Sequence, residues 1–140
     1  MAVVTRDMVR QALVNRIISL KNTFTAFPLE VEYDNKVTID LTKQQKPFLQ
    51  FSIVYQDGEQ VGLGIETPSR VMGTIVMAVR GREGSGVVDM DKVIDHFFRA
   101  IGKTDTIGPV RTYAARFSSS PSMNGWVSQA ALVPFWYDTD

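Results

Sequence analysis

The chain has 140 residues, 44% of them hydrophobic, which is enough for a single domain with a sizeable core. Lys plus Arg and Asp plus Glu number 15 each, and this balance argues against a dedicated nucleic-acid-binding protein, which usually carries a basic excess. The absence of cysteine excludes disulfides and thiolate chemistry. No apolar run reaches the roughly 20 residues that span a bilayer, and no signal-peptide pattern is visible. We therefore expect one domain, residues 1–140, in the cytoplasm.

The first part of the chain predicts an amphipathic helix followed by a strand. Thr5 can cap the helix, and Asp7 in its first turn interacts favourably with the helix dipole. Apolar residues then recur every three or four positions as far as Leu20. Residues 29–33 alternate between apolar and acidic side chains, which predicts a half-buried strand, and Asp34 begins a turn.

Three further segments lead to the middle of the chain. Alternation over residues 37–41 predicts a short edge strand. Residues 48–56 predict a longer strand, and the Asp57-Gly58 pair after it is typical of a hairpin. Residues 59–68 contain Gly62 and Gly64, so we expect a loop or an irregular strand there.

Residues 69–102 form the unit around which the rest of the fold is expected to pack. Their first part, residues 70–80, is rich in β-branched side chains and predicts the best strand of the chain. A glycine-rich loop follows at residues 81–86. Apolar residues then recur at helical spacing from Met90, and Gly102 stands where a glycine commonly ends a helix.

The C-terminal part predicts two more strands. After a connector, residues 110–117 alternate and predict a strand. The serine-rich residues 118–125 predict a mobile loop, and Trp126 to Tyr137 predict a last strand that is apolar on both faces.

These elements predict an α+β fold. Most connections between strands are too short for parallel crossovers, so we expect a mainly antiparallel sheet of four to five strands with two main helices packed on one face. The odd-numbered face of the 70–80 strand should form the core with both helices. The residues expected to meet there are Leu13, Ile17, Phe51, Ile75, Met77, Phe97 and Ile101.

The glycine-rich loop allows two interpretations. Gly81, Gly84 and Gly86 between a strand and a helix suggest a phosphate-binding loop, but the Gly-Lys-Ser/Thr ending and the Rossmann glycine spacing are both missing. We favour a flexible loop whose exposed Arg82 and Glu83 contact a neighbouring chain.

The titratable residues do not form a recognisable metal-binding pattern. His96 is the only histidine, and Asp89, Asp91 and Asp95 lie near it, which makes a metal site conceivable. The ligand spacing of known sites is missing, however. We interpret the aspartates as helix-capping and surface residues, and His96 as a residue on the solvent flank of the helix.

Other candidates for catalysis are equally incomplete. The serines at residues 118–122 lack the strained Gly-x-Ser-x-Gly turn of hydrolases. Glu30, Glu32 and Asp34 alternate with apolar residues, and we interpret them as the wet face of a half-buried sheet rather than an acid–base pair. The sequence therefore predicts no catalytic residue, no cofactor and no metal site, and we do not expect an enzyme.

An excess of apolar strand surface is the more informative feature. The 70–80 strand and the last strand are apolar on both faces, yet two helices cover only one face of such a sheet. Large exposed apolar patches are rare on monomers, so we expect self-association. The residues expected at the interface are Arg82, Glu83, Trp126, Phe135, Trp136 and Tyr137.

Several features spread over nearly the whole chain carry a family resemblance. They are the amphipathic N-terminal helix, Pro28 before a strand, Pro47-Phe48-Leu49 at the entry to another, Arg70 and Gly73 in the long strand, a helix ending near Phe97-Phe98, and Trp126 leading into Val133-Pro134-Phe135. In these features the chain resembles the phage tail terminator proteins, also called tail completion or minor tail protein U-like proteins.

This resemblance implies a structural protein of the virion. Family members form a ring, typically a hexamer, which caps the tail tube, stops its polymerisation and provides the joint to the head-side connector. DNA passes through the lumen without specific binding, and no cofactor or membrane is involved. The implied location is the head-proximal end of the tail, and the host cytoplasm during assembly. The alternatives are another head–tail joining or neck protein, or a small enzyme or ligand-binding domain with a pocket on the sheet.

Overall fold

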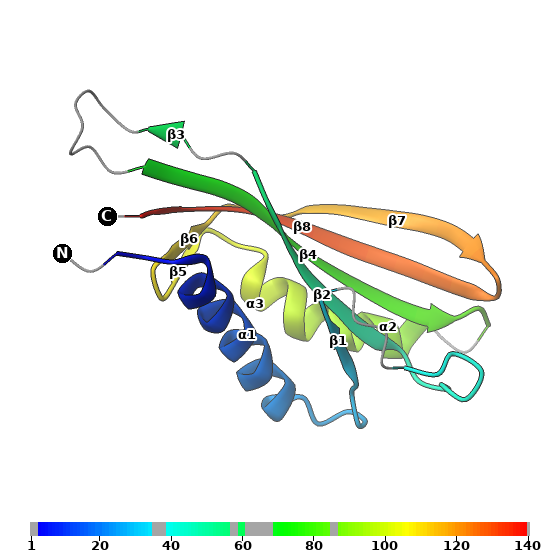
Figure 1. The fold of residues 1–140 in the computed structure, drawn as a ribbon. Coiled ribbons are helices and arrows are strands. Elements are labelled where there is room, and N and C mark those ends of the chain that lie inside the picture. The colour runs from blue at the N-terminus through cyan, green and yellow to red at the C-terminus, as the bar shows by residue number, and fades with distance from the viewer. Residues whose placement is uncertain (1–2, 35–38, 57–58, 61–68, 85–86, 140) are drawn as a thin grey trace.

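The computed structural model describes residues 3–34, 39–56, 59–60, 69–84 and 87–139. In this part of the chain, helices lie against one side of a single twisted sheet (Figure 1). The predicted α+β class, with the helices on one face, is confirmed.

The helices follow the predicted periodicity. Helix α1 spans Arg6–Thr23, and Thr5 caps it by accepting a hydrogen bond from the Met8 N–H at 3.3 Å. The second helical run comprises α2 (Val87–Val93), the π-helical turn η1 (Ile94–Phe98) and α3 (Arg99–Ile101). The π turn was not predicted, because the apolar spacing from Met90 to Ile101 is also compatible with a continuous α-helix.

The end of the second helical run also differs from the prediction. Gly102 follows α3 but has a φ of −73°, so it does not take the left-handed conformation of a C-terminal glycine. Its N–H donates to the Phe98 carbonyl at 2.6 Å, and its own carbonyl accepts from the Ala115 N–H at 3.1 Å. The helix end is therefore tied to the segment that leads into β7.

The sheet is larger than predicted: the described residues form eight strands in place of four to five. The order is β1-β2-β4-β8-β6-β5, with β3 beside β4 and β7 beside β8. Strands β1 and β2 are parallel and every other pair is antiparallel, so the sheet is mixed. The strands are β1 (Val31–Tyr33), β2 (Phe48–Tyr55), β3 (Glu59–Gln60), β4 (Ser69–Arg82), β5 (Asp105–Ile107), β6 (Val110–Thr112), β7 (Arg116–Met123) and β8 (Trp126–Asp138).

The serine-rich segment accounts for one of the additional strands. Residues 118–122 were predicted to be a loop but lie in β7, because the long apolar β8 offers them a backbone partner. The loop is reduced to Asn124 and Gly125, whose φ values of 54° and 79° match a two-residue hairpin turn. Strands β7 and β8 thus form a hairpin at one edge of the sheet (Figure 1).

Two predicted segments are changed or fall partly outside the described residues. Within 37–41, Ile39 and Asp40 are not in a strand and Leu41 begins a turn, whereas residues 37 and 38 lie outside the described part. Within 59–68, residues 59–60 form β3 and residues 61–68 lie outside it. The turn is fixed by Asp40, whose carboxylate accepts from the Thr42 hydroxyl at 2.7 Å and from the Thr42 N–H at 3.0 Å. These hydrogen bonds lower the pKa of Asp40.

The core lies between the helices and the odd-numbered face of β4, as predicted. Phe97 is fully buried in it, at 0% exposure. All seven side chains expected to meet there are buried in one cluster: Leu13, Ile17, Phe51, Ile75, Met77, Phe97 and Ile101.

Candidate assembly surface

The side of the sheet that faces away from the helices carries a group of apolar side chains, with the polar Ser52 and Thr74 among them. Neighbouring residues in the β2–β4 and β4–β8 ladders place these side chains next to one another. The helices of the described residues lie on the other side of the sheet; Val54 is 53% exposed, and the other five side chains are half-buried. We call this surface the open face, and it consists of Val54, Met72, Val76, Leu132, Pro134 and Trp136.

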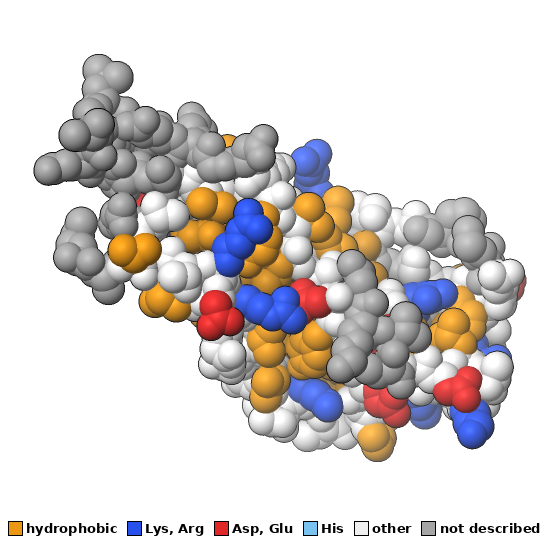
Figure 2. Space-filling view, viewed as in Figure 1, with side chains coloured by type: hydrophobic (Ala, Val, Ile, Leu, Met, Phe, Trp, Pro, Cys, Tyr) orange, Lys and Arg blue, Asp and Glu red, His pale blue; other side chains and the backbone are white. Residues whose placement is uncertain are grey.

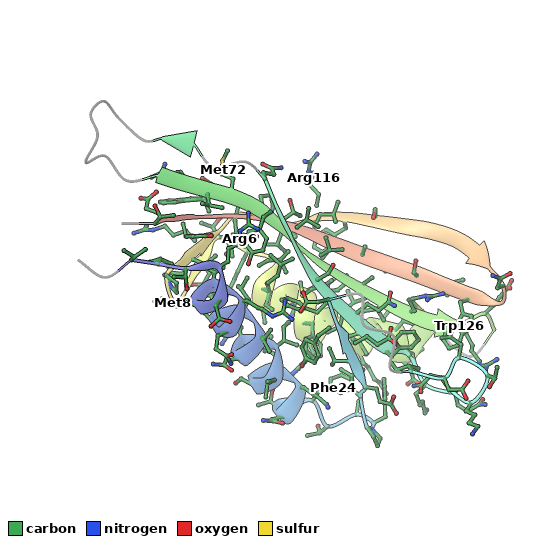
Figure 3. All side chains as sticks on the ribbon, viewed as in Figure 1. Arg6, Met8, Phe24, Met72, Arg116 and Trp126 are labelled. Carbon is green, nitrogen blue, oxygen red and sulfur yellow. The ribbon has the colours of Figure 1, made fainter. Side chains whose placement is uncertain are left out.

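The orientation of the open face can be followed at two labelled residues. Met72 on β4 and Arg116 at the start of β7 point away from the helical layer, whereas Phe24 lies at the end of α1 on the opposite side (Figure 3). Arg116 is opposite Leu132 in the β7–β8 ladder, so its exposed guanidinium stands at the border of the open face.

One end of the open face is organised around Trp136. The Arg70 guanidinium lies 3.9 Å from the centre of the Trp136 ring, and the Arg111 guanidinium lies 5.5 Å from it. Arg70 also makes two hydrogen bonds to Asp138, at 2.9 and 3.2 Å. An aromatic ring with paired arginines is a composition enriched in the cores of protein interfaces.

The other end of the sheet is covered by the chain itself. Residues 39–46 fold back over it, and Ile39, Phe48 and Trp126 form a second buried cluster there. The Phe48 and Trp126 rings meet edge to face, with 5.6 Å between their centres.

Arg82 holds this covering segment in place. Its Nε donates to the Gln44 carbonyl at 2.6 Å, and its Nη2 donates to the Leu41 carbonyl at 2.7 Å. The prediction that Arg82 lies exposed in a flexible loop and contacts a neighbouring chain is therefore wrong. Strand β4 continues through Arg82, and the side chain binds its own chain. Gly81 also lies in this strand, where a Cβ would approach Met90 Sδ to 2.8 Å.

The interpretation of the acidic strand also needs correction. Glu32 does not lie on a solvent-exposed face of the sheet. It is buried, at 6% exposure, under the same covering segment. Its carboxylate accepts from the Ile39 N–H and from Gln50 Nε2, each at 2.9 Å. Asp34 forms an ion pair with Arg10, and Glu30 is exposed. Residues 39–46 were not predicted to cover the sheet because no local pattern encodes that contact.

The six predicted interface residues separate into different environments. Trp136 lies on the open face, and Glu83 is exposed at the end of β4. Phe135 and Tyr137 are buried in the main core, at 1% and 2% exposure, and Trp126 is buried in the second cluster. These three side chains contact their own chain, so the prediction that they face a partner is corrected. Of the six, Trp136 is thus the one aromatic that contributes to the open face.

The candidate residues for catalysis are not brought together. His96 lies between the two helical runs, where its Nε2 donates to the Leu20 carbonyl at 2.7 Å. Asp89 pairs with Lys46 at 3.1 Å. Within the described ranges, no group of three or more His, Asp or Glu side chains is arranged to hold a metal ion.

The charges on the surface are mixed. In the view of Figure 2, basic and acidic side chains are scattered among hydrophobic ones, and no large area carries a single sign. Among the residues described, no helix is both long and apolar enough to cross a membrane.

Comparisons with known proteins give the fold alone. No family model matches the sequence, and no curated protein matches it. A solved structure whose name describes no function has a similar fold, with a TM-score of 0.66 and 14% sequence identity. The match covers 97% of this chain and 96% of the other. At this identity the likeness supports the α+β architecture over the whole chain and carries no function with it.

Proposed function

We propose that this chain is a structural protein of virion assembly, a tail terminator whose copies form a ring, with six subunits expected. The ring caps the tail tube, stops its polymerisation and provides the joint to the head-side connector. The open face is the observation that carries this proposal, because an apolar sheet face without a cover within the described residues is suited to burial against another chain.

Two further observations support the proposal. The net charge of zero means that several copies can pack closely with little long-range repulsion. DNA that passes through a lumen requires weak contact rather than tight binding, which agrees with the mixed surface charge. We propose a tail terminator in particular because the sequence features described above resemble that family.

Self-association is tested with a matched pair of valine substitutions. Val54→Asp places a charge on the open face, and Val88→Asp places the same charge on α2, where the valine is 66% exposed. We expect light scattering and negative-stain images to show rings for the parent chain and for Val88→Asp. Val54→Asp should raise the concentration needed for assembly at least ~tenfold. A strict monomer for the parent chain at every concentration, also with tail tubes present, would overturn the proposal.

The assignment as a terminator is tested in the phage. Deletion of the gene should give overlong tails in electron micrographs, because nothing then stops tube growth. Normal-length tails detached from filled heads would instead identify a neck protein that joins finished tails to heads.

A further inference from the structure

A second interaction surface lies on the helical side of the sheet, along the second helical run. Charged residues occur there at every fourth position, first two acidic and then two basic, at Asp91, Asp95, Arg99 and Lys103. All of these side chains are exposed, and within the described part of the chain none of them forms an ion pair. We call this row of residues the charged stripe.

The backbone keeps the charged stripe on one side of the run. In a regular α-helix with about 3.6 residues per turn, every fourth residue drifts around the axis by roughly 40°. The π-helical turn η1 contains Asp95 and ends directly before Arg99, and its wider turn opposes this drift. Asp95, Arg99 and Lys103 accordingly line the same groove, which has a volume of about 470 Å³ and lies beside β7.

An exposed phenylalanine borders the charged stripe. Phe117, on the edge strand β7, lines the same groove and is 65% exposed. Its ring stacks on Phe98 of η1, with 6.0 Å between the ring centres and 25° between the planes. The Ala115 N–H donates to the Gly102 carbonyl at 3.1 Å, which fixes the start of this strand to the helix end. An apolar ring next to exposed charges is a composition typical of protein interfaces, which combine apolar and aromatic residues with a polar rim.

The order of the charges makes the stripe complementary to a second copy of itself. If two copies pair in antiparallel orientation around position 97, Asp95 faces Arg99 of the partner subunit and Asp91 faces Lys103 of the partner subunit. Two-fold symmetry repeats each of these contacts. A parallel arrangement in register would instead place like charges together, which is unfavourable.

The balance of the charges also selects the kind of partner. The stripe contains as many acidic as basic residues, so a strongly acidic partner would meet repulsion from its first half, and a strongly basic partner from its second. A second copy in antiparallel orientation offers an opposite charge at every position of the stripe.

We propose that two copies of this chain form a two-fold dimer through their charged stripes, with Phe117 of each copy covered at the border of the contact. This inference goes beyond the proposed ring and does not depend on it. The open face and the charged stripe lie on opposite sides of the sheet, so one copy can make both contacts at once (Figure 1).

The dimer is tested in the full chain carrying Val54→Asp, in which the open face is disabled. We expect sedimentation velocity at low salt, where exposed charges are screened least, to show a concentration-dependent dimer. Asp95→Arg should weaken the dimer at least ~tenfold, because a like charge then faces Arg99 of the partner subunit. Adding Arg99→Asp to that variant should restore the dimer, because the two-fold axis places the exchanged charges opposite each other. A chain that is monomeric at millimolar concentration, a dimer that Asp95→Arg leaves unchanged, or an exchange that restores nothing would each overturn the inference.

A mixing experiment in the same Val54→Asp chain tests the antiparallel pairing of whole stripes. Asp91→Lys with Asp95→Arg gives an all-basic stripe, and Arg99→Asp with Lys103→Asp gives an all-acidic one. Each variant alone should be monomeric, whereas an equimolar mixture should form a heterodimer.

The control for this mixture separates pairing of the stripes from general charge attraction. Lys43→Asp with Arg111→Asp gives the same net charge as the all-acidic variant, at exposed positions outside the stripe. This control should bind the all-basic variant at least ~tenfold more weakly than the all-acidic variant does. Equal binding by the two would overturn the inference.

The contribution of the aromatic ring is tested by truncation. Phe117→Ser should weaken the dimer at least ~threefold, because an apolar ring is then missing at the border of the contact. Tyr113→Ser is the matched control, because this tyrosine is 50% exposed beside Trp136 on the open face, and it should leave the dimer unchanged. Equal dimer stability for both variants would overturn the placement of Phe117 in the contact.

The two proposals fail separately. Rings of the parent chain together with a monomeric Val54→Asp chain would overturn the two-fold dimer and leave the proposed function standing. A dimer of the Val54→Asp chain without rings of the parent chain would do the reverse.

Discussion

The ring of Phe135 lies over Gly73 on the neighbouring strand. The two residues are opposite each other in the β4–β8 ladder, and a Cβ on Gly73 would lie 2.6 Å from Phe135 Cζ. The same Cβ would lie 2.5 Å from the Val54 carbonyl oxygen. The Phe135 ring also meets the Tyr55 ring edge to face, with 6.0 Å between their centres. The aromatic ring thus fills the place of the missing side chain and leaves no room for a larger residue at position 73.

Replacement of this glycine should destabilise the fold. We expect Gly73→Ala to lower the free energy of unfolding by roughly 1–3 kcal/mol, because the added methyl group meets a backbone carbonyl that cannot move aside easily. Urea denaturation provides the measurement. Thr74→Ala, at the next position on the opposite face, is the control and should change stability by less than about 1 kcal/mol. Equal stability for the Gly73→Ala and parent chains would show that the sheet accommodates the methyl group.

Two phenylalanines in different environments provide a test of the core. Phe97 is fully buried, so Phe97→Ala should lower the free energy of unfolding by about 3–5 kcal/mol. Phe117 is 65% exposed, so Phe117→Ala should cost less than about 1 kcal/mol. Both values come from the same denaturant melts. If Phe97→Ala lowered the free energy of unfolding only slightly, the second helical run would present a different face to the sheet.

Arg82 should be a stabilising residue of the covering segment. Arg82→Ala removes hydrogen bonds from a charged group to the Leu41 and Gln44 carbonyls, which we expect to cost about 1–3 kcal/mol. In a Trp136→Phe background the fluorescence reports on Trp126 alone, and it should shift to the red as the segment loosens. Arg99→Ala, an exposed arginine on α3, is the control. An unchanged Trp126 spectrum would argue that the cluster holds the segment without the guanidinium.

Stability should fall in alkaline solution because of two tyrosines, the buried Tyr137 and the half-buried Tyr55. Burial raises the pKa of Tyr55 and of Tyr137, and the Arg6 guanidinium beside them opposes part of this increase. Above pH ~10 the unfolded chain releases its phenolic protons before the folded chain does, so the free energy of unfolding decreases as the pH rises. Below that pH both tyrosines keep their protons in the folded and in the unfolded chain, so their full contribution to the free energy of unfolding is retained.

The tyrosine effect can be separated from general alkaline damage. Urea melts between pH ~8 and ~11 should show a smaller decline for Tyr55→Phe and for Tyr137→Phe than for the parent chain. Tyr113→Phe, at an exposed position, serves as the control and should retain the decline of the parent chain. The same decline in all four proteins would assign the alkaline sensitivity to other groups.

The sequence by itself determined the elements whose signals are local. Thr5 and the helical spacing after it define α1, because a cap and an apolar stripe act within a few residues of each other. The run of β-branched residues defines β4, and its more apolar odd positions correctly indicate the core face. Together these signals determined the α+β class with the helices on one face.

The tertiary structure decided what depends on distant partners. Phe135, Trp136 and Tyr137 are adjacent aromatics, and alternation divides them into two faces without showing which face the helices cover. Residues 118–122 form a strand because β8 provides backbone partners, although their composition favours a loop. Trp126 is buried and Arg82 is engaged because residues 39–46 fold back across the sheet, a contact of about 40 positions in sequence that no local pattern encodes. The open face follows from the same cause, because it is defined by what packs on one side of the strands and not on the other.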